Sequence, residues 1–145
     1  MSKKMDWLRK SVTGEIPPPP VAQLVGFRLV AIEPGKAVVD FEATEKHWNP
    51  MGTLHGGILC DVADAAMGIA YNSTLEDDES FTTLELKINF LRPVRTEKLR
   101  AEGKIVKRGK TIGLVECDVT NAEGALVARC SSTCMTLRGE QARGR

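Results

Sequence analysis

One segment restricts the fold of this chain more than any other, because it reads as a helix that is apolar on most of its faces. The segment covers residues 56–73. A helix of this kind must be covered on more than one side, and a chain that has a single such helix needs a sheet curved around it. The rest of the chain is therefore expected to supply that sheet.

The segments on either side of the helix predict six strands. Two precede the helix and flank Pro34-Gly35, a turn dipeptide, which predicts a hairpin. Four follow the helix as a meander. The predicted fold class is α+β, with one long central helix wrapped by a curved antiparallel sheet. The predicted strands cover residues 27–33, 37–43, 83–90, 99–107, 111–120 and 126–137.

The first strand after the helix has the clearest alternation. Its period of two predicts that one face carries four apolar side chains. The same parity places Thr83 on the opposite face. The four apolar residues are Leu84, Leu86, Ile88 and Phe90.

Three regions are expected along the chain. Residues 1–24 hold a short amphipathic helix at 1–14 and a proline-rich linker at 17–20, where the prolines stop any helix and favour the polyproline II conformation. One further helical turn is expected at 21–25. The main domain covers 25–138, and residues 139–145 form a polar tail that is expected to fray. The helix at 1–14 would pack through Met5, Leu8 and Val12.

Charge and hydropathy exclude several classes of function. Twenty basic and nineteen acidic residues in 145 give a net charge of +1, so no global field favours nucleic acid or an anionic membrane. The N-terminus has no apolar stretch of the kind found in signal peptides, and no segment is apolar enough to span a bilayer. We therefore expect a soluble, cytoplasmic protein without nucleic-acid or membrane partners.

The four cysteines are expected to be structural. They include no Cys-x-x-Cys pair, and together with two histidines they make a poor zinc site, so no metal site is predicted. Cys130 and Cys134 lie four residues apart in a predicted strand, so both point to one face as small apolar side chains. Free thiols of this kind fit a reducing compartment.

Asp64 is the residue of greatest chemical interest, because it lies in the middle of the apolar helix. Burial of an unpaired carboxylate is costly or raises its pKa, so a chain that keeps one there usually uses it. The alternative is a structural carboxylate paired with an arginine or with backbone amides. Asp61 needs no such explanation, because it lies early in the helix and offsets the helix dipole.

Helical spacing predicts two faces for this helix. One face is assigned to the sheet. The opposite face is small except for a tyrosine and is assigned to an interface or cleft, which would expose Asp64 to a ligand or a second backbone. The first face comprises Val62, Ala65, Ala66 and Ile69, and the second comprises Gly57, Cys60, Asp64, Gly68 and Tyr71.

The start of the helix offers backbone donors. Gly56 and Gly57 open the helix, where backbone N–H groups have no intrahelical acceptor, and glycine lets a substrate carbonyl approach them closely. Such an amide can stabilise a developing oxyanion. Capping of the helix by glycine alone remains the simpler interpretation of this pair.

The order Asn49-x-x-Gly52-x-x-His55-Gly56-Gly57 followed by Asp64 resembles the hotdog-fold acyl-CoA thioesterases. The resemblance is to the PaaI-like (phenylacetate-degradation) branch of the 4-hydroxybenzoyl-CoA thioesterase superfamily. The strand at 83–90 with Pro93, and the segment 107–111, are also similar to this family. The resemblance covers about residues 25–138 and implies the hotdog fold.

The resemblance also implies a role for each matching residue. Asp64 matches the catalytic carboxylate, which acts as nucleophile or as general base on water. Gly56 matches the glycine whose amide polarises the thioester carbonyl. Asn49 matches the asparagine that places the attacking group or the carbonyl. His55 matches a histidine that orients this loop and contacts the leaving sulfur, although a purely structural role is equally open. Thr83 matches a hydroxyl position that holds the water.

Three further expectations come from the family. The Asp and the Gly–Asn pair belong to different protomers, which implies an obligate homodimer, commonly paired into a tetramer. The substrate is an acyl-CoA, so no cofactor is needed beyond the coenzyme A that the substrate carries. Its phosphates are expected to meet basic residues near the later hairpin and the end of the first post-helix strand. The basic residues are Arg108, Lys110 and Arg92, with Lys107 beside them, and Gly109 is expected to contribute from the same hairpin.

The leading hypothesis is hydrolysis of an acyl-CoA thioester to a carboxylic acid and coenzyme A. A hotdog hydratase acting on enoyl thioesters is less favoured, because the two histidines, at positions 47 and 55, both precede the helix. A non-catalytic acyl-CoA-binding module is the other alternative. Residues 1–24 are too few to hold the DNA-binding domain that such modules usually carry.

Overall fold

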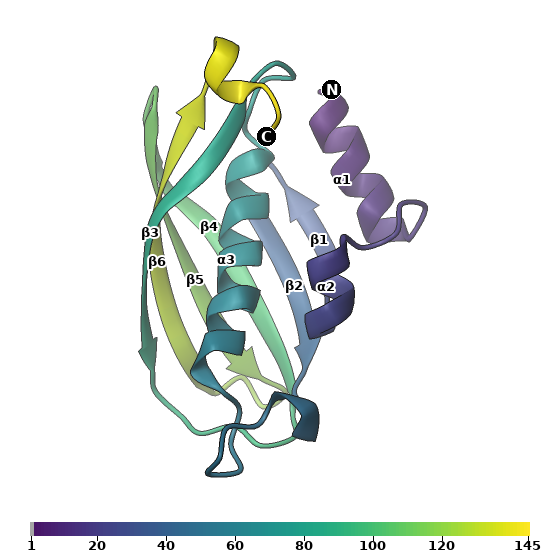
Figure 1. Cartoon of the computed structure of the whole chain (residues 1–145), viewed down its shortest axis with the longest axis vertical. Helices are drawn as coiled ribbons and strands as arrows, with labels where there is room; N and C mark the ends of the chain where they lie inside the picture. Colours follow the sequence, from purple (N-terminus) through teal and green to yellow (C-terminus); the bar gives the residue numbers. More distant parts are fainter. Residues whose placement is uncertain (1) are drawn as a thin grey trace.

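The chain forms one curved antiparallel sheet that wraps around a central helix (Figure 1). The structure is a computed structural model that describes residues 2–145. The strand order is β1-β2-β4-β5-β6-β3, so β1 and β3 are the two edges. The helices are α1 (Lys3–Thr13), α2 (Pro20–Val25) and α3 (Gly56–Asn72), and the strands are β1 (Phe27–Glu33), β2 (Lys36–Glu42), β3 (Ser80–Phe90), β4 (Lys98–Arg108), β5 (Ile112–Asn121) and β6 (Leu126–Leu137). Two short 3-10 turns are η1 (Glu45–His47) and η2 (Gly139–Ala142).

The predicted helix, the six strands and their class are confirmed. The predicted meander of four strands is wrong, because β3 pairs with β6 at the far edge of the sheet and only β4, β5 and β6 follow one another. The β1–β2 hairpin turns at Pro34-Gly35, where Gly35 has a φ of 79°, a conformation that glycine adopts without strain. β3 begins at Ser80, three residues before the predicted start at residue 83. The predicted tail contains the turn η2.

The N-terminal segment packs onto the main body. Ser2 caps α1 by accepting a hydrogen bond from the Met5 amide, and Gly14 ends it in the left-handed conformation. Met5 and Leu8 belong to the hydrophobic core, and Val12 packs against it. Residue 1, which the helix prediction included, lies outside the described residues. Pro20 belongs to the next helix instead of the linker, because proline is tolerated at the first position of a helix.

The core lies between α3 and the concave face of the sheet. Helix side chains such as Val62, Ala66 and Met67 are fully buried there, as are Val39 and Val115 from the strands. The helix approaches β4 most closely at Gly103, where an added Cβ would lie 2.8 Å from the backbone nitrogen of Met67. The small side chains on both sides allow this close approach.

The predicted division of α3 into two faces is partly wrong. Tyr71, which was assigned to the interface face, is fully buried, and its hydroxyl lies 2.8 Å from Thr136 Oγ1 of β6. Ala65 and Ile69, which were assigned to the sheet, are only half-buried and line a cavity on the other side of the helix. Because the sheet curves around α3, it covers a wider arc of the helix at its C-terminal end than a flat sheet would.

The predicted alternation along β3 is wrong at Leu84, because the pairing of β3 with β6 shifts between Thr83 and Glu85. This bulge turns Leu84 outward and leaves it 52% exposed, while Leu86 and Ile88 face the core. Thr83 therefore shares the inner face with Leu86. A one-residue irregularity of this kind has no signal in an alternating sequence.

We predict that Gly103→Ala destabilises the protein by about 1–3 kcal/mol, because the new Cβ would press against the backbone of α3. Urea unfolding at a fixed protein concentration measures this change. Lys104→Ala, at the neighbouring exposed position of β4, is the control and should change stability by less than about 0.5 kcal/mol. Equal stability of the Gly103→Ala protein and the unchanged chain would contradict the close approach of α3 to β4.

Candidate functional site

The N-terminus of α3 presents two unpartnered backbone donors. His55 stands at the cap position but its side chain makes no capping hydrogen bond. Within residues 2–145 no acceptor receives the N–H groups of Gly56 and Gly57, whereas the Ile58 N–H donates to the His55 carbonyl. The Phe90 ring of β3 lies against Gly56, where an added Cβ would sit 2.7 Å from it. Two amides at a helix N-terminus can stabilise negative charge on an oxygen.

Asn49 organises the loop that leads into this helix. Its side-chain oxygen accepts hydrogen bonds from the Met51 amide at 2.9 Å and the Thr53 amide at 3.2 Å, and its side-chain nitrogen donates to Thr53 Oγ1 at 2.9 Å. A bridge between Trp48 and Leu54 closes the same loop. In the single chain the Asn49 amide therefore fixes the shape of the loop.

The two histidines differ in their surroundings. Both ring nitrogens of His47 are engaged, Nε2 at 2.7 Å from the Val25 carbonyl and Nδ1 accepting from the Thr44 amide at 3.0 Å. The His55 side chain is exposed and lies over Gly57, where an added Cβ would be 3.1 Å from its Nε2. His47 is therefore structural, while the imidazole of His55 remains accessible beside the two free amides.

Asp64 lies at the middle of α3 and contacts β3. Its Oδ1 accepts a hydrogen bond of 3.2 Å from the Thr83 hydroxyl, which the bulge after Thr83 leaves on the inner face of the strand. Desolvation raises the pKa of the Asp64 carboxyl above its usual value, and the charge of Asp61 raises it further, while the bond from Thr83 lowers it. The carboxyl reaches the surface of the single chain, so its desolvation is incomplete.

The Asp64 carboxylate and the Gly56 amide of one chain cannot act on the same carbonyl. They are eight residues apart on one helix, which separates them by about 12 Å along its axis. Each nevertheless contacts β3, Asp64 through Thr83 and Gly56 through Phe90. The single chain thus holds two half-sites along one strand.

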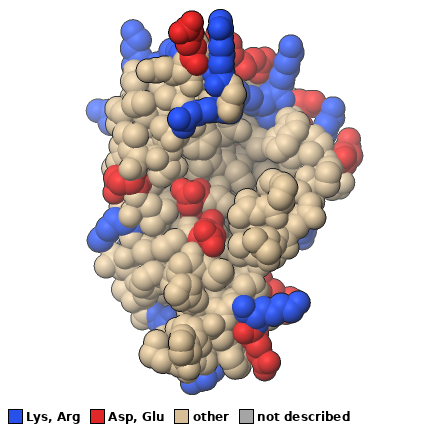
Figure 2. Space-filling view, viewed as in Figure 1, with Lys and Arg blue, Asp and Glu red and all other residues tan. Residues whose placement is uncertain are grey.

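A cavity of about 300 Å³ opens beside Asp64, between α3 and the N-terminal segment. Figure 2 shows this face of the molecule as hollowed, with acidic side chains nearby. Most of the lining is apolar, and Asp64 and Thr83 are part of it. The other lining residues are Trp7, Leu8, Ser11, Ile16, Pro18, Pro19, Ala22, Phe27, Arg28, Leu29, Ala65, Gly68, Ile69, Asn72 and Phe81.

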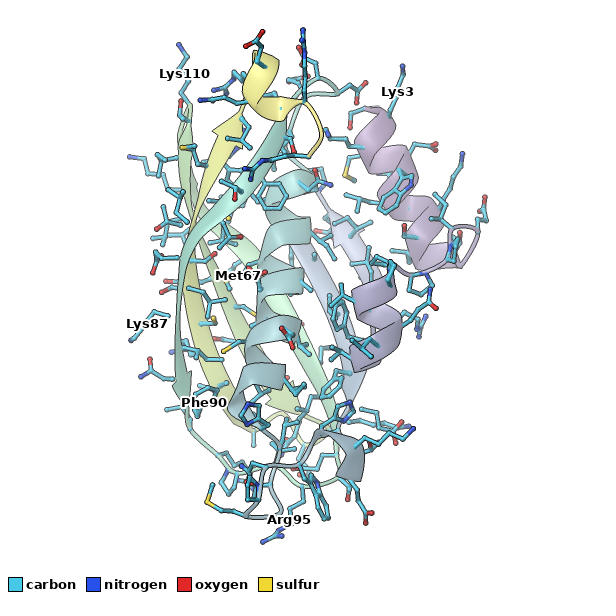
Figure 3. All side chains as sticks on the ribbon, viewed as in Figure 1. Lys3, Met67, Lys87, Phe90, Arg95 and Lys110 are labelled. Carbon is cyan, nitrogen blue, oxygen red and sulfur yellow. The ribbon has the colours of Figure 1, made fainter. Side chains whose placement is uncertain are left out.

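The basic residues proposed for coenzyme A do not gather in one chain. Figure 3 places Lys110 at one end of the molecule and Phe90, which precedes Arg92 by two residues, at the other. Lys110 and Arg92 are exposed. Arg108 turns inward over the Tyr71 ring, 4.7 Å from its centroid, and donates to Thr74 Oγ1, while Gly109 forms the tight turn beside it.

Sequence reasoning missed the contribution of α1 to the cavity. Its apolar stripe of Met5, Leu8 and Val12 explains how the helix packs, but Trp7 lies outside that stripe and is 48% exposed. A large aromatic side chain outside the packing stripe of a helix was the available signal. The side chain of Phe90 over Gly56 was likewise not anticipated.

Further features bear on the chemistry open to this chain. Among the residues that the structure describes, no three His, Cys, Asp or Glu side chains come together as a possible metal site. The four cysteines are free, and Cys117, Cys130 and Cys134 are buried, as expected of structural thiols. None of the helices within residues 2–145 has the length and apolar character needed to cross a membrane.

Comparison with known proteins identifies the family. Residues 51–128, more than half of the chain, match the model of a family described as "Thioesterase superfamily". The chain belongs to the thioesterase superfamily. The predicted resemblance and the thioesterase assignment are thereby confirmed at the level of the family.

Individual relatives agree with this assignment. The chain is 33% identical over 112 residues to the 1,4-dihydroxy-2-naphthoyl-CoA hydrolase of Listeria monocytogenes, covering 77% of this chain and 89% of the relative. It is 31% identical over 103 residues to human acyl-coenzyme A thioesterase 13, covering 70% and 73% of the two chains.

Solved structures confirm the hotdog fold. The Escherichia coli PaaI protein of the phenylacetic acid degradation operon superposes with a TM-score of 0.81 at 24% identity, covering 91% of this chain and 94% of that one. A thioesterase family protein from Silicibacter pomeroyi has a TM-score of 0.81 at 27% identity, with coverage of 91% and 99%.

We predict that Thr83→Val raises the pKa of Asp64 further, because it removes the hydrogen bond that favours the ionised carboxylate. Carbon NMR titration of the aspartate carboxyls measures this, with the Asp64 signal assigned from its loss in Asp64→Asn. Thr83→Ser keeps the hydroxyl and should leave the titration nearly unchanged. An unchanged midpoint in Thr83→Val would show that this bond does not act on the carboxylate.

Proposed function

We propose that the protein hydrolyses acyl-CoA thioesters to a carboxylic acid and coenzyme A, with each active site shared between two chains. The observation that carries the proposal is that both half-sites contact the same free edge strand, β3. The family assignment and the names of the relatives support a thioester of coenzyme A as substrate.

The edge strand β3 can bring two chains together so that they share an active site. An unpaired edge of eleven residues tends to pair with another chain. An antiparallel pair of β3 strands centred on Lys87, in which the bulge after Thr83 takes up one residue, sets Thr83 of one chain opposite Phe90 of the second. Asp64 of the first chain then faces the free amides of Gly56 and Gly57 in the second. The end-for-end arrangement also brings the hairpin at 108–110 of one chain toward Arg92 of the other, where coenzyme A phosphates would bind.

The division of labour follows from the groups at each half-site. The Gly56 N–H donates a hydrogen bond to the thioester oxygen as negative charge develops on it. Asp64 attacks the carbonyl carbon directly or removes a proton from an attacking water, and Thr83 holds the carboxylate or that water. The tetrahedral intermediate then expels coenzyme A as a thiolate, which takes up a proton. When Asp64 attacks directly, this leaves an acyl–Asp64 anhydride, and a water molecule then hydrolyses it to the carboxylic acid and regenerates the carboxylate. Asn49 and His55 hold and flank the loop that presents the amide.

A second apolar surface supports a pair of dimers. Four large side chains on the outer face of the sheet are 40–52% exposed, and a patch of this kind on a sheet face favours association with a second dimer. These side chains are Leu84, Val106, Ile112 and Leu114. The proposed assembly is therefore a homodimer through β3 that pairs into a tetramer. The free cysteines fit the proposed cytoplasmic location.

We predict that Asp64→Asn lowers kcat by at least about a hundredfold, because the amide neither attacks the carbonyl nor accepts a proton. Release of the coenzyme A thiol from a panel of aromatic and aliphatic acyl-CoAs is the measurement. Asp61→Asn, one turn earlier on the same helix and exposed, is the matched control and should keep most of the activity. Full turnover by Asp64→Asn would remove Asp64 from the mechanism, and coenzyme A binding without thiol release by the unchanged chain would favour a binding module.

We predict that Gly56→Pro lowers kcat by about 10²–10³, because it removes the amide hydrogen at a helix position that tolerates proline. The extended backbone of His55, with ψ of 130°, suits a residue that precedes proline. Gly56→Ala is the control, because it adds a Cβ against the Phe90 ring but keeps the N–H. A loss of the same size in both variants would assign the effect to crowding.

Mixing these variants tests whether the site is shared. A dimer of one Asp64→Asn chain and one Gly56→Pro chain has one intact site, so unfolding and refolding the mixture should restore up to about a quarter of the normal activity. Each variant refolded alone serves as the control. A mixture that stays as inactive as the separate variants would place both groups of a working site in one chain.

A further inference from the structure

The proposed hydrolysis of an acyl-CoA does not say which group occupies the cavity beside Asp64. It lies between α3 and the N-terminal segment, with Asp64 and Thr83 at its wall. Its volume of about 300 Å³ is at the lower end of the range for ligand pockets and is too small for a whole acyl-CoA. The space beside the reacting carboxylate therefore suits the acyl part of a thioester.

The lining indicates the chemistry of that acyl part. Ile69 of α3, Leu29 of β1 and Phe81 of β3 present apolar surface, and Pro18 and Pro19 close the side next to α2. Arg28 also lines the cavity, but it is exposed and therefore hydrated. A second carboxylate on the substrate would leave water for an apolar space next to Asp64, which is unfavourable. The cavity therefore favours a neutral, apolar acyl group.

The wall on the N-terminal side is firmly held. Met5 and Leu8 of α1 are buried in the core, and the backbone N–H of Lys3 donates to Asp77 Oδ1 at 2.9 Å, which ties the start of α1 to the loop after α3. α1 lies beside β1 along its length (Figure 1). These contacts make α1 a fixed wall of the cavity.

Trp7 is the largest side chain that this wall contributes. It lines the cavity but is 48% exposed, so burial in the core does not account for its position. The family match begins at residue 51, so α1 lies outside the matched part of the chain. The group that limits the cavity on this side thus belongs to a segment separate from the reacting groups.

We propose that this cavity binds the acyl group and that Trp7 is a specificity-determining residue that restricts it to compact, neutral, apolar acyl groups. The proposal rests on the proposed thioesterase function. Trp7 takes no part in the chemical step, and it acts by limiting the space for the end of the acyl group.

The test compares kcat/KM of the unchanged chain and of Trp7→Ala for butanoyl-, hexanoyl-, decanoyl-, benzoyl- and succinyl-CoA. The unchanged chain should prefer hexanoyl- or benzoyl-CoA over decanoyl- and succinyl-CoA. Trp7→Ala should raise the ratio of decanoyl-CoA to hexanoyl-CoA activity by about tenfold, the effect expected for a small change in an apolar pocket. Trp7→Phe should restore much of the original ratio.

The control is Leu24→Ala, which removes an 85% exposed apolar side chain of α2 that does not line the cavity. It should leave the ratio unchanged. A Trp7→Ala protein that alters kcat/KM by the same factor for every chain length would overturn the proposal, and so would a preference of the unchanged chain for succinyl-CoA.

Binding separates this proposal from the proposed function. Butyl-, hexyl- and decyl-CoA thioethers cannot be hydrolysed, so calorimetric titration measures their affinity without turnover. Trp7→Ala should raise the affinity for decyl-CoA, relative to the affinity for hexyl-CoA, by about tenfold. If the unchanged chain hydrolyses none of the thioesters and Trp7→Ala still shifts the thioether affinities in this way, the proposed function fails and the proposed acyl site stands. If it hydrolyses them and the thioether affinities keep their ratio, the function stands and the role of Trp7 fails.

Discussion

The proposed chemistry depends on one constraint, which is that β3 contacts α3 both at its N-terminus and at its middle. Thr83 and Phe90 come from one strand, and they contact Asp64 and Gly56 respectively. Because the helix itself separates these two groups by eight residues, no rearrangement of side chains joins them within one chain. The strand that touches both is also an edge of the sheet, so the surface that a second chain would cover is the surface that carries the two half-sites.

The position of Asp64 makes its ionised carboxylate less favourable for stability but better suited to the proposed chemistry. Desolvation raises the pKa of its carboxyl in the folded chain, so the folded state binds a proton more readily than the unfolded one. The contribution of this carboxyl to stability is therefore fully present below its unfolded pKa of about 3.9 and is lost as pH rises through the higher pKa of the folded state. The bond from Thr83 reduces this loss. A carboxylate held in this way is less well solvated, which suits a group that must attack or accept a proton.

The sequence was sufficient for the parts of the fold that follow from periodicity and turn chemistry. The apolar helix, the Pro34-Gly35 hairpin and the class of the sheet follow from local pattern. Tyr71 was misplaced because a helical wheel assumes that the sheet covers one flat side, whereas the curved sheet surrounds the end of α3. Leu84 was misplaced because its outward position depends on the pairing of β3 with β6. The residues proposed for catalysis were found from spacing and resemblance, and the resemblance also implied that they are divided between two protomers. The contact of both groups with β3 could not be found in this way, because it depends on how the helix packs against the edge strand.

The groups proposed to react and the N-terminal wall of the proposed acyl cavity come from different parts of the chain, and this separation has a physical basis. Gly56, Asp64 and Thr83 require a helix N-terminus, a rigid helix and a paired strand, so any change in their setting disturbs the core. Trp7 sits on a helix that is anchored by two other side chains, Met5 and Leu8. Its own side chain can therefore change size without loosening α1. Under the two proposals, such a fold keeps its chemical step while the N-terminal segment sets the space available to the acyl group.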